Sequence, residues 1–101
     1  MLRSRRKLLG RVELDPAIEK QLEDTGLLEV HFATRKADTS MLSLDGNRTI
    51  AWMAPSGELA GLLVQDYHDG VGTRVIPFAF GELELVNDGA ELSVFLRTRT
   101  T

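Results

Sequence analysis

The sequence predicts a mainly β domain with one short helix, at the margin of the α+β class. Three observations lead to this prediction. From Leu27 onward, apolar and polar residues alternate with period two, as in strands that bury one face. Turn residues interrupt the alternation at short intervals, and tight turns join antiparallel strands. Before Leu27, one segment has the capping residues and the apolar spacing of a helix.

The helix is expected over residues 15–25. Asp15 is a typical N-cap, and Pro16 fits the first helical position because an N–H there has no helical partner. Gly26 is a natural stop, since glycine readily adopts the left-handed conformation that follows the last turn. The same segment therefore contains a start signal, a short apolar stripe and a stop signal.

The strands are expected to fill residues 27–101. Turn signals recur at residues 45–47, 55–57, 69–70 and 87–89. The strand ranges between and around them are 27–34, 41–45, 48–54, 58–67, 73–80, 82–86 and 91–99. Joined in order by tight turns, these segments form an antiparallel meander of about six or seven strands.

Turn lengths predict which residues face each other. Three-residue loops at 45–47 and 55–57 place Leu42 opposite Ile50 and Trp52 opposite Ala60. A hairpin between the strands at 58–67 and 73–80 completes one inner face. Its members are Leu42, Leu44, Ile50, Trp52, Leu62, Val64, Ile76 and Phe78.

The last hairpin is expected to turn at Asp88-Gly89 and to place Leu85 opposite Leu92. The apolar phase changes at Gly81, which predicts a bulge or corner and a sheet curled into a small barrel or a bent sheet. The face opposite the inner one is also apolar, and a large apolar surface is typical of an interface. Its predicted members are Met41, Ala51, Met53, Leu59, Leu63, Val75 and Ala79.

Length and composition limit the possible functions. A chain of 101 residues is expected to form a single domain, residues 1–101. It has no cysteine, which excludes disulfides, thiolate metal sites and a cysteine nucleophile. No apolar run approaches the roughly 20 residues of a membrane-spanning helix. No metal or cofactor is expected.

The charge distribution is uneven, although the net charge is only −3. Residues 1–11 form a basic arm that contains five of the 12 basic side chains and none of the 15 acidic ones. Such an arm can bind a polyanion, dock on a protein or fold back on its own acidic domain. Alternatively, residues 7–14 form a first strand whose edge is protected from aggregation by Lys7 and Arg11.

The start of the chain is similar to a twin-arginine export signal. Ser4-Arg5-Arg6-Lys7-Leu8-Leu9 provides the arginines, but Arg11 follows almost at once and the apolar region of a signal is missing. The expected location is therefore cytoplasmic, or within a larger particle.

Three functions are considered. The first is a non-enzymatic interaction module that binds a protein or a second copy of itself; its predicted contact residues are Arg3, Arg5, Arg6, Lys7, Arg11, Met41, Met53, Leu59 and Leu63. The second is a small nucleic-acid-binding β domain, in which the arm acts with Phe95, Arg97 and Arg99 of the last strand.

The third function is a metal-assisted enzyme. Asp66 and His68 share a strand face, but a metal site needs further ligands, and a polar strand end that enters a turn explains these residues equally well. The serines lack a nucleophile motif and the glycines form no phosphate loop. An enzyme is therefore not expected.

Residues 37–64 resemble a family of short uncharacterised bacterial proteins. The resemblance rests on Ala37-Asp38 before a strand and on Gly57-x-x-x-Gly61-Leu62 in the following hairpin. Met41-Leu42 replaces the tyrosine-centred strand of that family, and Ala54 stands where an acid is expected. The resemblance implies a small accessory protein and assigns no site residue.

Overall fold

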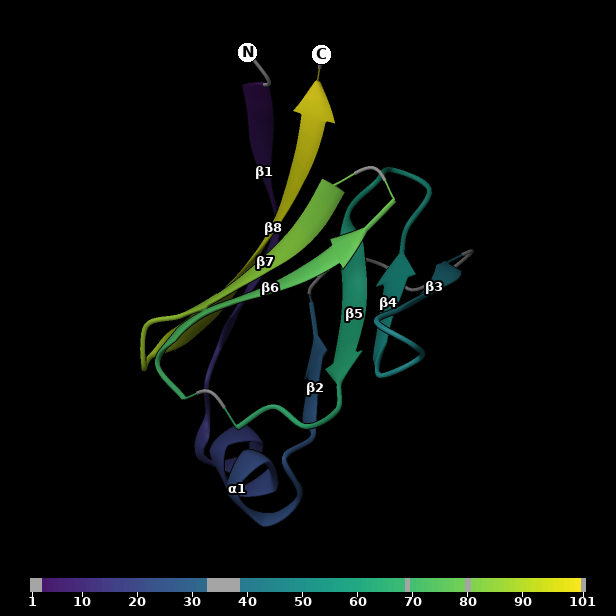
Figure 1. Ribbon diagram of the computed structural model, residues 1–101. Helices are drawn as coiled ribbons and strands as arrows, with labels where there is room; N and C mark the ends of the chain where they lie inside the picture. Colours follow the sequence, from purple (N-terminus) through teal and green to yellow (C-terminus); the bar gives the residue numbers. More distant parts are fainter. Residues whose placement is uncertain (1–2, 33–38, 69, 80, 101) are drawn as a thin grey trace.

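In the part of the chain that the structure describes, two antiparallel sheets of four strands each and one short helix make up the fold (Figure 1). The computed structural model describes residues 3–32, 39–68, 70–79 and 81–100, and side chains only from residue 6 to residue 98 within these ranges. The mainly β class predicted from the sequence is confirmed. The elements are β1 (Arg3–Glu13), α1 (Pro16–Thr25), β2 (Leu28–His31), β3 (Ser40–Leu44), β4 (Thr49–Met53), β5 (Leu59–Val64), β6 (Gly72–Phe78), β7 (Gly81–Asn87) and β8 (Glu91–Thr100).

The strands divide into sheet A, with the order β1-β8-β7-β6, and sheet B, with the order β2-β5-β4-β3. Each sheet contains one three-strand meander of the kind predicted, β6-β7-β8 and β3-β4-β5. The predicted hairpin between β5 and β6 is wrong, because the chain leaves sheet B at Val64 and enters sheet A at Gly72. The described strands thus form two sheets rather than a closed barrel.

Residues 3–13 are a strand rather than a free arm. β1 pairs with β8 from Arg3 opposite Thr100 to Glu13 opposite Glu91, with a bulge between Leu8 and Gly10. Leu9 is turned inward at this bulge and is buried. The alternative drawn from the sequence, a first strand with charged residues along its edge, therefore describes this segment better than a basic arm does.

The helix begins and ends where the sequence predicts. The Asp15 carboxylate accepts a hydrogen bond from the Ile18 N–H at 2.9 Å, Pro16 begins the helix, and the Gly26 N–H donates to the Leu22 carbonyl. Gly26 has a φ of 67°, the left-handed conformation expected of a C-terminal glycine. The helix packs beside β2 at one end of sheet B (Figure 1).

The turn between β3 and β4 is one residue longer than predicted. It spans residues 45–48, and Asp45, Gly46 and Asn47 all have positive φ. Leu42 is therefore opposite Ala51, not opposite Ile50. Because side chains alternate between the two faces of a strand, this change of one residue turns Ile50 away from the core.

A bulge between β4 and β5 completes the change of face. Met53 is opposite Leu59 and Trp52 is opposite Gly61, so that Ala60 is the additional residue. Leu59 is fully buried and Met53 packs against the core. The prediction that Ala51, Met53 and Leu59 belong to an outer apolar face is therefore wrong.

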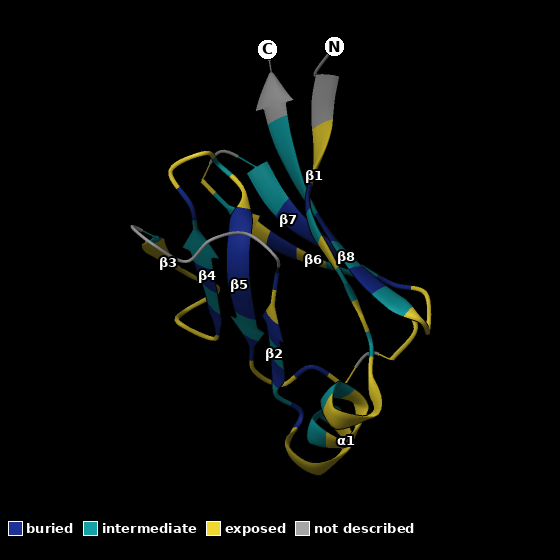
Figure 2. Cartoon of the chain, turned by 180° about the vertical axis from the view of Figure 1, so that it is seen from behind, coloured by how far each residue is buried: buried dark blue, intermediate teal, exposed yellow. Residues whose placement is uncertain are grey.

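In the hairpin of β7 and β8, the side chains point to the predicted sides of the sheet, but the register differs from the prediction. Leu85 is opposite Val94, two residues beyond the predicted partner Leu92. A shift of two residues leaves every side chain on the same face. Leu83, Leu85, Leu92 and Val94 are accordingly all buried. Figure 2 shows buried segments along β7 and β8.

The hydrophobic core lies between the two sheets, and its two sides are closed in different ways. On one side, the ring of Phe32, which follows β2, covers Gly10 of β1. On the other side, β3 and β6 approach each other as unpaired sheet edges. The buried core residues are Leu9, Leu28, Val30, Phe32, Ala51, Leu59, Leu62, Val64, Tyr67, Ile76, Leu83, Leu85, Leu92 and Val94.

Candidate functional site

The outer face of sheet B presents four large apolar side chains to solvent. Met41 lies opposite Trp52 across β3 and β4, and Ile50 lies opposite Leu63 across β4 and β5. The strand neighbours Ala51, Leu62 and Val64 are buried on the other side, which directs Ile50, Trp52 and Leu63 outward. Met41 shares this face because it is the cross-strand partner of Trp52. Met41 is 63% exposed, and the other three are half-buried. We call Met41, Ile50, Trp52 and Leu63 the outer patch.

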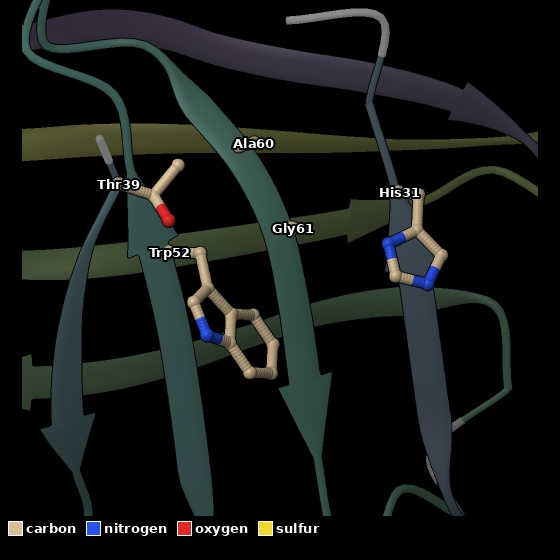
Figure 3. Close-up of a pocket in the computed structure, with 5 residues that line it drawn as sticks. All are labelled: His31, Thr39, Trp52, Ala60 and Gly61. Atoms are coloured by element: carbon tan, nitrogen blue, oxygen red, sulfur yellow. The ribbon is translucent and has the colours of Figure 1, made fainter. Parts of the chain in front are cut away.

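A pocket of about 290 Å³ adjoins the outer patch between Trp52 and His31 (Figure 3). Gly61 forms its floor: a Cβ atom there would lie 3.2 Å from Trp52 Cε3 and 3.6 Å from His31 Nδ1. Ala60 and Thr39 complete the lining. The His31 ring lies 3.5 Å from a Glu29 carboxylate oxygen, so one wall is polar. The pocket therefore combines the face of a half-buried indole with a polar rim.

Trp52 and Ile50 are contact candidates that the sequence reasoning placed in the core. The reason is the length of the turn at residues 45–48, since a three-residue loop would have turned both side chains inward. Leu63 and Met41 keep their predicted outward positions. Hydropathy does not indicate that Trp52 and Ile50 point outward. Tryptophan and isoleucine are more apolar than the threonine and alanine that occupy the inner face of β4.

The basic residues of β1 lie along a sheet edge, and two of them have partners within the chain. Arg6 contacts a Glu84 oxygen at 2.7 Å. Arg11 lies 3.3 Å from Ser93 Oγ and 3.6 Å from a Glu91 oxygen. Lys7 is exposed. The side chains of the remaining predicted arm residues, Arg3 and Arg5, lie outside the described part of the structure.

Two of the three predicted nucleic-acid residues of β8 are engaged with their own sheet. The Arg6 guanidinium lies 3.6 Å from the centre of the Phe95 ring and covers that face. Arg97 lies 3.4 Å from a Glu84 oxygen and 3.8 Å from a Glu82 oxygen. The described cations of this face are therefore balanced by neighbouring carboxylates. The side chain of Arg99, the third predicted residue, is not among those described.

The structure places the two residues of the predicted metal pair directly after β5. Asp66 has a φ of 56° at the turn that follows β5, and its carbonyl accepts a hydrogen bond from Arg74 at 3.0 Å. The His68 ring packs on Gly26, where a Cβ atom would lie 2.4 Å from the ring. Within the described ranges, no three histidine, aspartate or glutamate side chains converge as a metal site. Asp69 lies outside those ranges.

Comparisons with protein-family models, with curated proteins and with solved structures found no match. Among the described residues, the chain contains no helix of the length and apolar character needed to span a membrane. The resemblance of residues 37–64 to a bacterial family remains a prediction, and Ala37-Asp38 lies outside the described residues.

Proposed function

We propose that this chain is a non-enzymatic interaction module that binds a protein surface through the outer patch of sheet B. The observation that carries the proposal is the position of Met41, Ile50, Trp52 and Leu63 together on the solvent side of one sheet. Methionine and aromatic residues are enriched where proteins meet, and exposed apolar clusters are typical of such surfaces. The surface belongs either to a foreign protein or to a second copy of this chain.

The neighbourhood of the patch supports a protein ligand. Trp52 offers an indole face beside a pocket of about 290 Å³, a suitable receptor for one anchoring side chain. His31 and Glu29 give the patch a polar rim, which is the usual surrounding of an apolar interface centre. The basic edge at Lys7 and Arg11 remains a secondary contact in this proposal.

The balance of charges on sheet A makes nucleic acid the weaker proposal. A polyanion would have to displace Glu84 from both Arg6 and Arg97, and it would have to displace Arg6 from the Phe95 ring. Sequence-independent binding to nucleic acid depends on cations that are free to replace counterions. The outer patch requires no such rearrangement before a partner binds.

The proposal is tested by photo-crosslinking in the native host. A benzophenone amino acid replaces Ile50 in one variant and Leu63 in another, with Val75 on the outer face of sheet A as the matched control, since it is 46% exposed. We expect adducts of discrete mass from positions 50 and 63 that a nuclease leaves intact. An adduct of twice the chain mass identifies a second copy.

A second variant tests the specificity of these adducts. Leu63→Lys in the Ile50 crosslinking chain should reduce the adduct at least tenfold, while circular dichroism shows an unchanged fold. Equal labelling from position 75, or adducts that a nuclease removes, would refute binding through the outer patch.

A further inference from the structure

Among the sheet edges that the structure describes, β3 differs from the others in containing neither a charged residue nor a proline. Natural edge strands avoid pairing through charges, proline or short length. Of the described edges, β1 contains Lys7 and Arg11, β6 contains Pro77, and β2 contains Glu29. β3 contains neither a charge nor a proline, and its Met41 and Leu42 are 63% and 48% exposed.

An apolar cavity of about 180 Å³ opens beside this edge, between the two sheets. Leu42 and Leu44 of β3 form one wall, and Phe78 of β6 lies on the opposite sheet. Every lining residue is apolar. The complete lining is Leu9, Leu42, Leu44, Ala51, Met53, Phe78, Leu83 and Leu96.

We propose that β3 binds an extended, uncharged segment of a partner protein, which adds to sheet B as a fifth strand. Main-chain N–H and C=O groups along the free edge of β3 pair with the segment. Every second side chain of the segment points toward the core side, and one of these enters the apolar cavity. This inference rests on the proposed function, because it requires that the chain binds a protein.

The size of the cavity indicates the anchoring side chain. An apolar cavity of roughly 150 Å³ accommodates a benzene molecule, and the cavity here has about 180 Å³. A phenylalanine or leucine side chain therefore fits. A charged side chain does not, because it would lose its hydration without gaining a partner among these apolar groups.

The small area of the edge favours a peptide segment over a globular surface. A strand of five residues is about 17 Å long. Covering one such strand buries far less than the roughly 800 Å² per partner that a stable association of folded proteins requires. Short segments that add to a sheet bind instead through main-chain hydrogen bonds and one anchor.

A second copy of the chain fits this edge poorly. Antiparallel pairing of two β3 strands about Leu42 would place Leu42 opposite its own counterpart. Leu42 and Leu44 already form the wall of the cavity in their own copy. Neither copy would therefore supply a side chain that fills the cavity of the other copy. The proposed occupant is therefore a foreign segment, and a dimer through β3 is an alternative outcome of the test.

The probe is a phage-displayed library of random twelve-residue peptides, selected on the purified full-length chain. We expect enriched peptides in which uncharged apolar residues alternate and a phenylalanine or leucine recurs. The best peptide is then synthesised with a fluorophore, and its affinity is measured by fluorescence polarisation. Leu42→Lys should weaken binding at least tenfold, whereas the matched surface change Val75→Lys should alter it less than twofold.

A scan of main-chain N-methyl groups decides whether the peptide binds as a strand. Only every second N–H of an added strand points to the sheet, so N-methylation should abolish binding at alternate positions and leave the others within about threefold. Three outcomes would overturn the proposal. The first is a loss of binding that does not alternate along the peptide, and the second is a selection that enriches no peptide. The third is a dimer of the chain that Leu42→Lys dissociates. If the proposal for β3 fails but positions 50 and 63 still crosslink to a protein, the proposed function of the outer patch is retained.

Discussion

The ring of Phe32 lies directly over Gly10 and thereby joins the end of β2 in sheet B to β1 in sheet A. A Cβ atom at residue 10 would lie 2.5 Å from Phe32 Cδ1 and 2.7 Å from Cε1. The Phe32 side chain is only 8% exposed and belongs to the core. The two sheets are therefore sealed at this side by an aromatic ring that requires glycine beneath it.

Gly10→Ala should destabilise the fold, because the new methyl group displaces a buried ring. We expect a loss of about 1–3 kcal/mol in the free energy of unfolding, measured by urea denaturation. Phe32→Leu is also destabilising alone, since it leaves space in the core. The double variant should lose at least ~0.5 kcal/mol less than the sum of the single changes. Additive losses would show that the ring and residue 10 do not constrain each other.

The sequence predicts the strands of this fold better than it predicts their partners. The helix from Asp15 to Gly26 follows from local caps, and the strand ranges from local alternation. Leu83 and Leu85 reach the core in spite of an incorrect register, because a shift of two residues preserves the face. Local chemistry is sufficient for these features.

Features that depend on turn length or on distant pairing were not predictable in the same way. Asp45, Gly46 and Asn47 tolerate positive φ in a loop of either three or four residues, and the choice between them reverses the face of Trp52. In the folded chain β5 contacts β1 of the other sheet, a segment far away in the sequence, and local alternation does not encode such a contact. The outer patch was consequently only half predicted: Met41 and Leu63 were identified, and Ile50 and Trp52 were not.

Glu84 should contribute more to stability than its neighbour Glu82, because it is less exposed and contacts two arginines. Its side chain is 10% exposed and lies 2.7 Å from Arg6 and 3.4 Å from Arg97. Glu82 is 24% exposed and lies 3.8 Å from Arg97. We expect Glu84→Gln to lower the free energy of unfolding by about 1–2 kcal/mol, and Glu82→Gln by less than ~0.5 kcal/mol. Equal losses in urea denaturation would contradict this ranking.

Thr49→Val should stabilise the chain. Thr49 is fully buried opposite Leu44 and Val64, and its Oγ1 has no hydrogen-bond partner among the described residues. Valine has nearly the same shape and removes the cost of burying an unpaired hydroxyl. We expect a gain of about 1 kcal/mol, read as a higher thermal midpoint.

Thr25→Val is the matched control for that change. The Thr25 hydroxyl donates to the Gln21 carbonyl at 2.8 Å and accepts from the Leu27 N–H at 3.2 Å. Replacing it should lower the thermal midpoint. A lower midpoint for Thr49→Val as well would indicate that the Thr49 hydroxyl is satisfied in solution.

The Asp88 turn should make stability depend on pH at the acidic end. The Asp88 carboxylate accepts hydrogen bonds from the Glu91 N–H at 2.7 Å and the Ala90 N–H at 2.8 Å, and these lower its pKa. A carboxyl group with a lowered native pKa stabilises the fold fully above its ordinary value of 3.8 and loses this contribution as the pH falls through the native pKa. Asp88→Ala should therefore have a lower urea midpoint than the parent chain at pH 7, and the gap should narrow below pH 3.8. Asp88→Asn is the control, because it keeps an acceptor oxygen but has no titrating group. The difference in urea midpoint between Asp88→Asn and Asp88→Ala should therefore stay constant with pH. If the difference between the parent chain and Asp88→Ala is also constant, the Asp88 carboxylate is not the source of the pH dependence.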